Sequence, residues 1–263
     1  MSPHNLPESD GSGVKQAVQQ QFDQAAANYR TSPIHASGAD LVQMVKLARL
    51  DGQEHVLDAG CGPGHTALRF SQFAAHVVGV DLAESMLDQA RRLAAERGLT
   101  NVDFRRGDVE ALPFADRAFD VVTTRYSAHH WPNPAAALAE FRRVLRPSGC
   151  LLLADVVSWN DYTVDTHFQT LELLRDPSHV RDHTVPQWLE MLDAAGFDAE
   201  IAFTWQIAID IPSWVARVNT QPEAVIMIRT LLANAPGEVR AALRVQPHGD
   251  FTMQCALLRG VPR

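Results

Sequence analysis

The sequence predicts an α/β fold built on a doubly wound, mostly parallel sheet of seven strands with helices on both faces. Two observations predict it. Short runs rich in β-branched residues alternate with helical stretches along the first part of the chain, which is typical of parallel strands joined by right-handed crossovers. The first of these runs also ends in a glycine-rich turn that opens a helix, as ligand-binding strands of such sheets do.

Five strands and three helices follow from this alternation, and two later runs complete the sheet. Pro134 suits the first turn of a helix, and Pro147 with Gly149 is expected to end that helix before the next strand. The expected strands are 56–60, 76–81, 102–108, 119–126 and 149–157, with the last two beginning near 199 and 251, and the expected helices are 64–74, 84–97 and 134–146.

The chain of 263 residues is expected to form one domain over residues 14–263. Residues 1–13 combine Pro, Gly, Ser and acidic residues without periodicity and are expected to form a flexible tail. The remainder divides into N-terminal helices over 14–50, a core over 51–157, a helical lid over 158–196 and C-terminal strands and helices over 197–263.

Composition excludes several classes of protein. A formal net charge of −8 argues against binding to nucleic acid, because phosphate neutralisation needs clustered Lys and Arg. The three cysteines are an odd number without CxxC spacing, so neither a disulfide framework nor a zinc site is indicated. Neither a signal sequence nor an apolar run approaching the ~20 residues that span a bilayer is found. A cytoplasmic protein that binds a small molecule is the resulting expectation.

The glycine-rich turn favours a cationic ligand over a diphosphate. Gly60 and Gly62 let the backbone turn sharply and approach a ligand closely. Asp58, just before them, would repel a pyrophosphate but attract an ammonium group. Pro63 lacks the N–H that a phosphate cradle would use. Cys61 lies in the same turn without an adjacent His base, so it is interpreted as a small packed residue of the site and not as a nucleophile.

Acidic residues also end the next two strands. Asp81 ends the second strand, where it could accept hydrogen bonds from both ribose hydroxyls of a nucleoside. Asp108 ends the third, where it could accept from the exocyclic amine of adenine while Val109 packs near the ring. The alternative is that each acid caps the helix that follows it. Their occurrence at three successive strand ends favours the ligand.

The segments VLDAGCGPG, VVGVDLAESML, VDFRRGDVEALPF, FDVVTTRYSAHHW and RVLRPSGCLLLADV closely resemble class I S-adenosylmethionine-dependent methyltransferases, in the methyltransferase type 11 and ubiquinone and menaquinone C-methyltransferase branch. The resemblance covers about residues 15–157 and implies a Rossmann-like sheet that binds S-adenosyl-L-methionine and releases S-adenosyl-L-homocysteine. From about residue 158 onward only the general architecture is similar, so the resemblance does not identify the acceptor.

The resemblance implies a role for each matching residue. Asp58, Gly60 and Gly62 would hold the methionine part of the cofactor and Asp81 its ribose. Leu82 or Met86 would cover one face of adenine, and Asp108 with Val109 its edge. Arg125 would line the cofactor, and Tyr29, on an N-terminal helix over 14–50, would cover it. The residues implied in cofactor binding, with Cys61 of the loop, are Tyr29, Asp58, Gly60, Cys61, Gly62, Asp81, Leu82, Met86, Asp108, Val109 and Arg125.

Methyl transfer from a sulfonium is an in-line displacement that needs no enzyme nucleophile, and a base is needed only if the acceptor keeps its proton. His129 and His130, after the fourth strand, are the candidates for a general base or a positioning group. The alternative is that they only fix the following loop. A metal site built on the pair is not expected, because no Glu or third His near them in sequence completes it.

Asp155 is a second candidate base, with a loop cap as its alternative. Four aromatic residues could form an apolar acceptor pocket under the lid, with core packing as the default for any one of them: Trp131, Trp159, Phe168 and Trp188. Three further histidines are assigned to the surface or the lid: His167, His179 and His183.

The function predicted from the sequence is methyl transfer from S-adenosylmethionine to a small-molecule acceptor. Three alternatives remain open. The glycine turn with Asp81 would also suit an NAD-dependent oxidoreductase, and the SAHHW segment also resembles tRNA and other RNA methyltransferases, which the acidic charge opposes. The chain could also be a non-catalytic module that binds S-adenosylmethionine.

Overall fold

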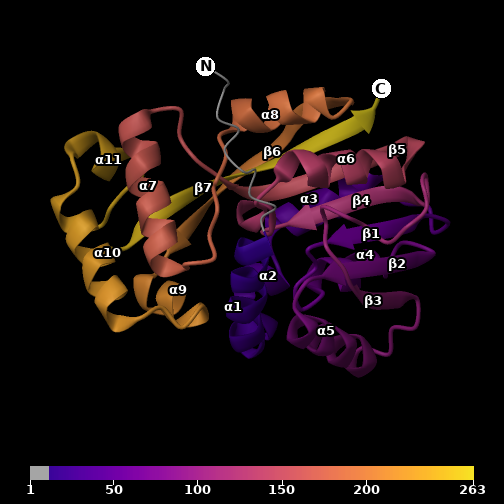
Figure 1. Cartoon of the computed structure of the whole chain (residues 1–263), viewed down its shortest axis with the longest axis horizontal. Coiled ribbons are helices and arrows are strands. Elements are labelled where there is room, and N and C mark those ends of the chain that lie inside the picture. The colour runs from indigo at the N-terminus through magenta and orange to yellow at the C-terminus, as the bar shows by residue number, and fades with distance from the viewer. Residues whose placement is uncertain (1–11) are drawn as a thin grey trace, which may run out of the picture.

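The computed structural model describes residues 12–263 (Figure 1). Residues 1–11 of the expected tail lie outside the described residues, and residues 12 and 13 already belong to helix α1 (Ser12–Arg30). Within the described residues, seven strands form a single sheet in the order β3-β2-β1-β4-β5-β7-β6. The prediction of a doubly wound, mostly parallel seven-stranded sheet is therefore confirmed.

The first five strands are parallel and carry the expected crossovers, whereas β7 runs antiparallel to both of its neighbours. The strand order reverses between β1 and β4, and ligands of such sheets bind at the carboxyl ends of the strands at this point. The strands are β1 (His55–Ala59), β2 (His76–Asp81), β3 (Val102–Arg106), β4 (Phe119–Arg125), β5 (Leu145–Val157), β6 (Phe197–Ile209) and β7 (Phe251–Pro262).

Helices cover both faces of this sheet because the strands bury apolar side chains on both sides. On one face lie α3 (Ala39–Ala48), α4 (His65–Phe70) and α5 (Glu84–Glu96). On the other lie α6 (Pro134–Val144) and α8 (Val185–Ala194). A short helix, α2 (Pro33–Ala36), and a 3-10 turn, η1 (Ala128–His130), complete the elements around the carboxyl ends of the strands.

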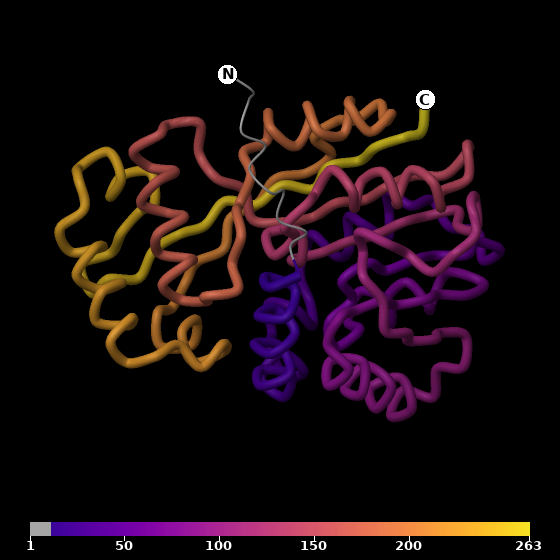
Figure 2. The backbone as a smooth tube through the Cα atoms, viewed as in Figure 1, coloured from indigo at the N-terminus to yellow at the C-terminus, as the bar shows by residue number. Residues whose placement is uncertain are grey.

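A helical lobe gathers at the end of the long strands β5, β6 and β7, to the left in Figure 1. Its helices are α7 (Tyr162–Arg175), α9 (Ile211–Arg217), α10 (Pro222–Asn234) and α11 (Gly237–Ala242). The expected lid over 158–196 is therefore divided, because α7 belongs to this lobe whereas α8 packs on the sheet. Helix α1 lies between the lobe and α5 (Figure 2). Gln21 and Asn28 on this helix donate hydrogen bonds to backbone carbonyls at the end of α9.

Two expected element boundaries differ in detail. Helix α4 ends at Phe70 and not near residue 74, since a turn follows at once. Strand β5 starts at Leu145 and not at Gly149, because Leu145 already pairs with Phe119 before an irregularity in the pairing. Among residues 12–263, no helix is both long and apolar enough to cross a membrane.

Candidate active site

One cavity, which we name the cofactor pocket, lies at the carboxyl ends of β1 to β4 and is covered by α1. Four residues of α1 form its cover: Lys15, Val18, Phe22 and Tyr29. Its remaining walls come mainly from the loops after the strands, and they contain Gly60, Cys61, Gly62, Asp81, Leu82, Met86, Asp108, Val109, Arg125, Tyr126, Ser127, His130 and Trp131. Ten of the eleven residues expected at the cofactor thus line one cavity, and Asp58 does not.

The glycine loop after β1 adopts backbone conformations that need glycine. Gly60 and Gly62 have φ angles of 70° and 50°, in the left-handed region. A Cβ on Gly60 would collide with Ser127 Oγ, whereas a Cβ on Gly62 would meet no heavy atom within 4 Å. The loop is held by Asp81, whose Oδ2 accepts from the Gly62 amide at 2.8 Å. The loop backbone therefore borders the pocket without side chains in between.

Asp58 occupies a different place from the one expected. Its side chain is 1 % exposed, and its two oxygens accept hydrogen bonds from the Ala67 amide in α4 (2.9 Å) and from Thr123 Oγ1 (3.1 Å). Burial raises the pKa of Asp58 to about 7, against the effect of these hydrogen bonds. Asp58 therefore bonds to the first turn of α4, as in the alternative of a helix cap, and it does not line the cofactor pocket. Its expected role with the methionine part of the cofactor stays a prediction.

The other two acids face the pocket. Asp81 Oδ1 also accepts from the Ala83 amide at 2.9 Å, and burial raises the pKa of this carboxyl. Asp108 is paired with Lys15 of α1, with 2.8 Å between Oδ2 and Nζ, and Glu110 shares the same ammonium at 2.6 Å. Three acids, Asp81, Asp108 and Glu110, line the pocket with two cations, Lys15 and Arg125. Arg125 is paired with Asp40, which does not line the pocket, so the acids are in excess and favour a positively charged ligand.

The pocket has apolar walls suited to a flat ring. Leu82, Met86 and Val109 line it, and the Met86 and Val109 side chains are buried. Tyr29 closes it from α1, with its ring packed edge-on against Phe22. Cys61 is buried as well, and burial keeps the pKa of its thiol well above the ordinary value, so the thiol remains protonated.

Arg125 acts as a clamp for the N-terminal helices. Its Nε lies 2.6 Å from Asp40 Oδ2, and both side chains are 3 % exposed. Its Nη atoms donate to the carbonyls of His35 (2.8 Å) and Ile34 (3.0 Å) in α2. This guanidinium lines the pocket, but its charge is already neutralised by a partner that sequence reasoning did not identify.

A second cavity, which we name the lid cavity, adjoins the cofactor pocket. The two cavities share Tyr126, which has a left-handed backbone conformation with φ of 54°. The lid cavity lies between the ends of the long strands and the helical lobe. Its lining residues are Ile34, Tyr126, His129, Val156, Glu172, Arg175, Asp182, Ile207, Ile209, Trp214, Arg217 and Met253.

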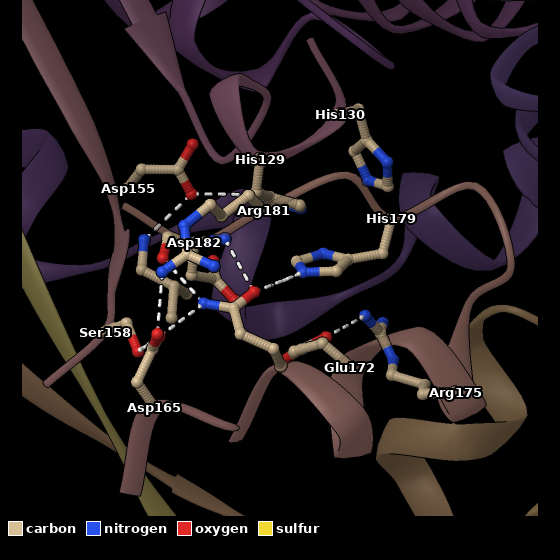
Figure 3. Close-up of polar contacts among 12 residues, drawn as sticks. His129, His130, Asp155, Ser158, Asp165, Glu172, Arg175, His179, Arg181 and Asp182 are labelled. Atoms are coloured by element: carbon tan, nitrogen blue, oxygen red, sulfur yellow. Dashed lines mark hydrogen bonds and ion pairs between the residues drawn. The ribbon is translucent and has the colours of Figure 1, made fainter. Parts of the chain in front are cut away.

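His129 and Asp155 form a buried pair at the wall of the lid cavity (Figure 3). His129 Nδ1 lies 2.7 Å from Asp155 Oδ1, and Asp155 Oδ2 accepts from the Ala128 amide at 2.7 Å. Although burial alone would lower it, the adjacent carboxylate raises the pKa of His129 to about 9. Asp155 thus accepts from the backbone of the η1 turn, as a loop cap would, and it also orients the histidine, a role that the sequence did not predict. Its expected role as a base stays a prediction.

His130 points into the cofactor pocket and has the opposite electrostatic character. Its side chain is buried, its Nδ1 donates to the Ser178 carbonyl at 3.1 Å, and its ring packs edge-on against Phe22. Burial, followed by the charge of His129, lowers the pKa of His130 to about 4. The ring is therefore neutral at physiological pH, with Nδ1 as the donor.

The loop between α7 and α8 docks on the η1 turn and brings residues that the sequence did not single out. The amides of Val180 and Arg181 donate to the His129 carbonyl at 2.9 and 3.1 Å. This docking places Asp182 beside His129, while Glu172 and Arg175 arrive from α7. The only signal in the sequence was the abundance of His and Asp between residues 160 and 195.

None of the four aromatic residues proposed for an acceptor pocket lines the lid cavity. Trp131 lines the cofactor pocket, Trp159 and Phe168 pack together in the lobe, and Trp188, a residue of α8, is buried against the sheet. Apolar core packing explains these positions, and Trp214 takes the place expected for them. His179, assigned to the surface or lid, is buried beside His129, whereas His167 and His183 are partly exposed.

One group of ligating atoms within residues 12–263 has a spacing that a metal ion could bridge. Single atoms of His129, Asp155 and Asp182 lie within 4.8 Å of one another. The Asp155 carboxylate, however, already accepts three hydrogen bonds, from His129 Nδ1 and from the amides of Ala128 and Val156. Of the four carboxylate oxygens, Asp182 Oδ2 is the buried one without a hydrogen-bond partner in the described chain.

Comparison with known proteins places this geometry in a family. Residues 57–153 match the methyltransferase domain of the methyltransferase type 11 model. The uncharacterised methyltransferase YcgJ of Bacillus subtilis is 36 % identical over 247 residues, which are 92 % of this chain and 98 % of YcgJ. The crystal structure of YcgJ superimposes with a TM-score of 0.82 at 35 % identity, over 85 % of this chain and 98 % of that one.

Two further relatives are similar over a smaller part of the chain. The uncharacterised protein YafE of Escherichia coli is 40 % identical over 74 % of this chain and 94 % of its own length. A malonyl-[acyl-carrier protein] O-methyltransferase of Yersinia pestis is 32 % identical over 64 % of this chain and 60 % of its own length. With the seven-stranded sheet and its glycine loop, these similarities show that the chain belongs to the class I S-adenosylmethionine-dependent methyltransferases of the type 11 family.

Proposed function

We propose that this protein transfers a methyl group from S-adenosyl-L-methionine in the cofactor pocket to a small-molecule acceptor in the lid cavity. The observation that carries the proposal is the shared wall at Tyr126, because two cavities that meet at one side chain can hold donor and acceptor in line. Holding two reactants in this way is worth about 7 to 11 kcal/mol of the barrier. S-adenosylmethionine would supply an electrophilic methyl group that passes directly to the acceptor.

The lining of the cofactor pocket fits this donor. The bare backbone at Gly60 and Gly62 leaves room for the methionine part, and Asp81 presents a carboxylate to the ribose hydroxyls. Leu82, Met86 and Val109 would hold the adenine ring, with Asp108 at its edge and Tyr29 as the cover. Arg125 and Cys61 would line the site, and Asp58 would support it from beneath by fixing the start of α4.

The two histidines would have different roles in the reaction. His130 is neutral and faces the donor, so it could accept a proton from an acceptor that keeps one or orient the acceptor atom. His129 keeps its proton through Asp155 and positions the wall of the lid cavity. Helix α1 covers the cofactor pocket, and the helical lobe borders the lid cavity.

Calorimetric titration with S-adenosylmethionine and S-adenosylhomocysteine tests the proposal. We expect 1:1 binding of both, and we expect Asp81→Asn to weaken it at least ten-fold, which is about 1.4 kcal/mol. Asp103→Asn is the matched control, since Asp103 is an acid on the neighbouring strand whose side chain is 56 % exposed. No binding of either ligand at high micromolar concentration would refute the proposal, and equal affinities of the two variants would remove Asp81 from the site.

The alternatives predict different results in the same protein. Tight NAD binding with indifference to S-adenosylmethionine would indicate an oxidoreductase, and strongly salt-dependent RNA binding would indicate an RNA methyltransferase. Cofactor binding without methylation of any member of a broad metabolite panel would indicate a non-catalytic module. The acidic lining of the pocket and the net charge of −8 favour the small-molecule methyltransferase over the oxidoreductase and the RNA methyltransferase. The lid cavity beside the cofactor pocket favours it over a non-catalytic module.

A further inference from the structure

We propose that the lid cavity selects an acceptor that carries an anionic group, held by Arg217 and Arg175, together with a hydroxyl or amine hydrogen-bond donor, held by Asp182. The acceptor class is therefore a small hydroxy acid or amino acid with an apolar body. This inference rests on the proposed function, because it takes the occupant of the lid cavity to be the methyl acceptor. It is carried by two polar groups of the cavity that lack hydrogen-bond partners among residues 12–263 and by the apolar surface between them.

Arg217 is the first of these groups. It is the last residue of α9, and its side chain lines the lid cavity. Its backbone carbonyl accepts from Asn28, but its guanidinium forms no hydrogen bond or ion pair with any side chain or carbonyl of residues 12–263. Burial, and then the charge of Arg175, lowers the pKa of Arg217. A guanidinium nevertheless stays charged at neutral pH, and this one is half-buried beside a second cation, with Glu172 as the nearby acid of the cavity. An anionic ligand would therefore find an unpaired guanidinium here.

Arg175 lies in the same cavity, and its five donors outnumber its contacts with Trp214, Glu172 and the Tyr29 hydroxyl. Its Nε donates to the Trp214 carbonyl at 3.2 Å, and its guanidinium lies 5.1 Å from the centre of the Trp214 ring. Its contact with Glu172 is long, at 3.4 Å between Nη1 and Oε2. Arginine presents five N–H donors in a planar fork that matches a carboxylate or phosphate. Two such forks on one cavity form a site for an anion.

Asp182 is the second group without a partner. Its side chain is 2 % exposed, and its Oδ2 accepts no hydrogen bond from any described residue. His179 Nε2 approaches only to 3.8 Å, and burial lowers the pKa of His179, so that ring is uncharged and forms no ion pair. Burial also raises the pKa of Asp182 well above its usual range. A buried carboxyl oxygen without a donor is unfavourable unless a ligand supplies an O–H or N–H.

The rest of the lining is apolar and explains the body of the acceptor. Val156, Ile207, Ile209, Met253 and Trp214 present hydrocarbon surface to the lid cavity. Neither Arg175 nor Arg217 lines the cofactor pocket, so the carboxylate of the methyl donor is not the anion that they are placed to hold. The polar groups of the lid cavity are therefore available to the acceptor.

Three matched probes separate the two contacts: 3-phenyllactate has the acid and the hydroxyl, 3-phenylpropionate has the acid alone, and 3-phenylpropionamide has neither. Their affinities are measured by calorimetry or ligand-detected NMR on the protein saturated with S-adenosylhomocysteine. We expect the acid to bind at least ten-fold more tightly than the amide, and the hydroxy acid at least three-fold more tightly than the acid.

Single substitutions then assign each preference to its residue. Arg217→Gln should abolish the preference for acid over amide and keep that for the hydroxyl, whereas Asp182→Asn should do the reverse. Arg181→Gln is the matched control, because Arg181 is 36 % exposed and pairs with Asp165 outside the cavity. Unfolding curves of each variant establish that it is folded.

Two binding results would overturn the inference: no binding of any probe at 10 mM, or equal binding of the acid and the amide. Two results with Arg217→Gln would overturn it as well: a preference for the acid that survives the substitution, or a drop in the affinity for S-adenosylhomocysteine. The last would mean that the arginine serves the donor. Binding of Mn²⁺ that Asp182→Asn abolishes would also overturn it, since Asp182 would then hold a metal. S-adenosylhomocysteine binding is measured separately, so failure here is distinct from failure of the proposed function.

Discussion

Removing the negative charge of Asp40 is expected to destabilise the protein far more than removing an exposed carboxylate. Asp40 and Arg125 form an ion pair at 2.6 Å with both side chains 3 % exposed. Breaking one partner of such a buried pair costs about 3 to 5 kcal/mol, because the other charge is left buried. Arg125 keeps two carbonyl acceptors, at His35 and Ile34, so we expect Asp40→Asn to fall near the lower end, at about 3 kcal/mol.

Urea unfolding followed by circular dichroism measures this loss, and in a thermal scan it corresponds to a decrease in Tm of roughly 6 to 12 °C. Asp193→Asn is the control, because its pair with Arg263 has side chains 71 % and 53 % exposed and should contribute at most about 1 kcal/mol. If the two variants lose the same stability, the Arg125 clamp does not stabilise the N-terminal helices in the way argued above.

Two further predictions concern the glycine loop and the histidine pair. Gly62→Ala should lower the free energy of unfolding by about 1 to 2 kcal/mol, because its backbone is left-handed. Gly60→Ala should lower it by about 1 to 3 kcal/mol more, because its Cβ would also collide with Ser127. Equal losses of stability in thermal unfolding would contradict this difference in packing. The pKa of His129 is raised from 6.5 to about 9, so its pair with Asp155 should contribute full stability below pH 6.5 and lose it as the pH rises through 9. Urea unfolding from pH 6 to 9.5 should show this loss in the native protein and a flatter profile in Asp155→Asn, and parallel profiles would count against the pair.

The sheet and most of the cofactor pocket were predictable because they depend on local patterns. The alternation of apolar strands and helices fixes where each strand ends, and the loops after parallel strands meet at one edge, so Asp81 and Asp108 could be placed together. The contacts of Asp58 could not be predicted, because a carboxylate before a helix is equally suited to capping it and to facing a ligand. Which of the two applies depends on whether Thr123 of β4 can donate a hydrogen bond to Asp58, and this is set by the tertiary structure and not by the local sequence.

The lid cavity could not be predicted for a different reason. Its polar residues come from α7, from the loop before α8 and from the end of α9, and nothing in the spacing of Glu172, Asp182 and Arg217 indicates that they share a cavity. Burial of an aromatic residue in a core and its exposure to a cavity also give the same sequence pattern, which is why Trp188 was a candidate and Trp214 was not.

The position of β7 has a consequence for the order in which the two cavities form. The pairings among β1, β2, β3 and β4 span at most about 65 residues of the chain, as between Val56 and Val121, whereas β7 joins β5 across about a hundred residues and supplies Met253 to the lid cavity. Contacts between residues far apart in the sequence form slowly, because the entropy of closing the loop is lost before the contacts stabilise the chain. During refolding, we expect the cofactor pocket to form and bind its nucleoside ligand before the lid cavity exists. Pulse-labelled amide exchange would show this as late protection of the amides of residues 251–262, and simultaneous protection of all seven strands would refute it.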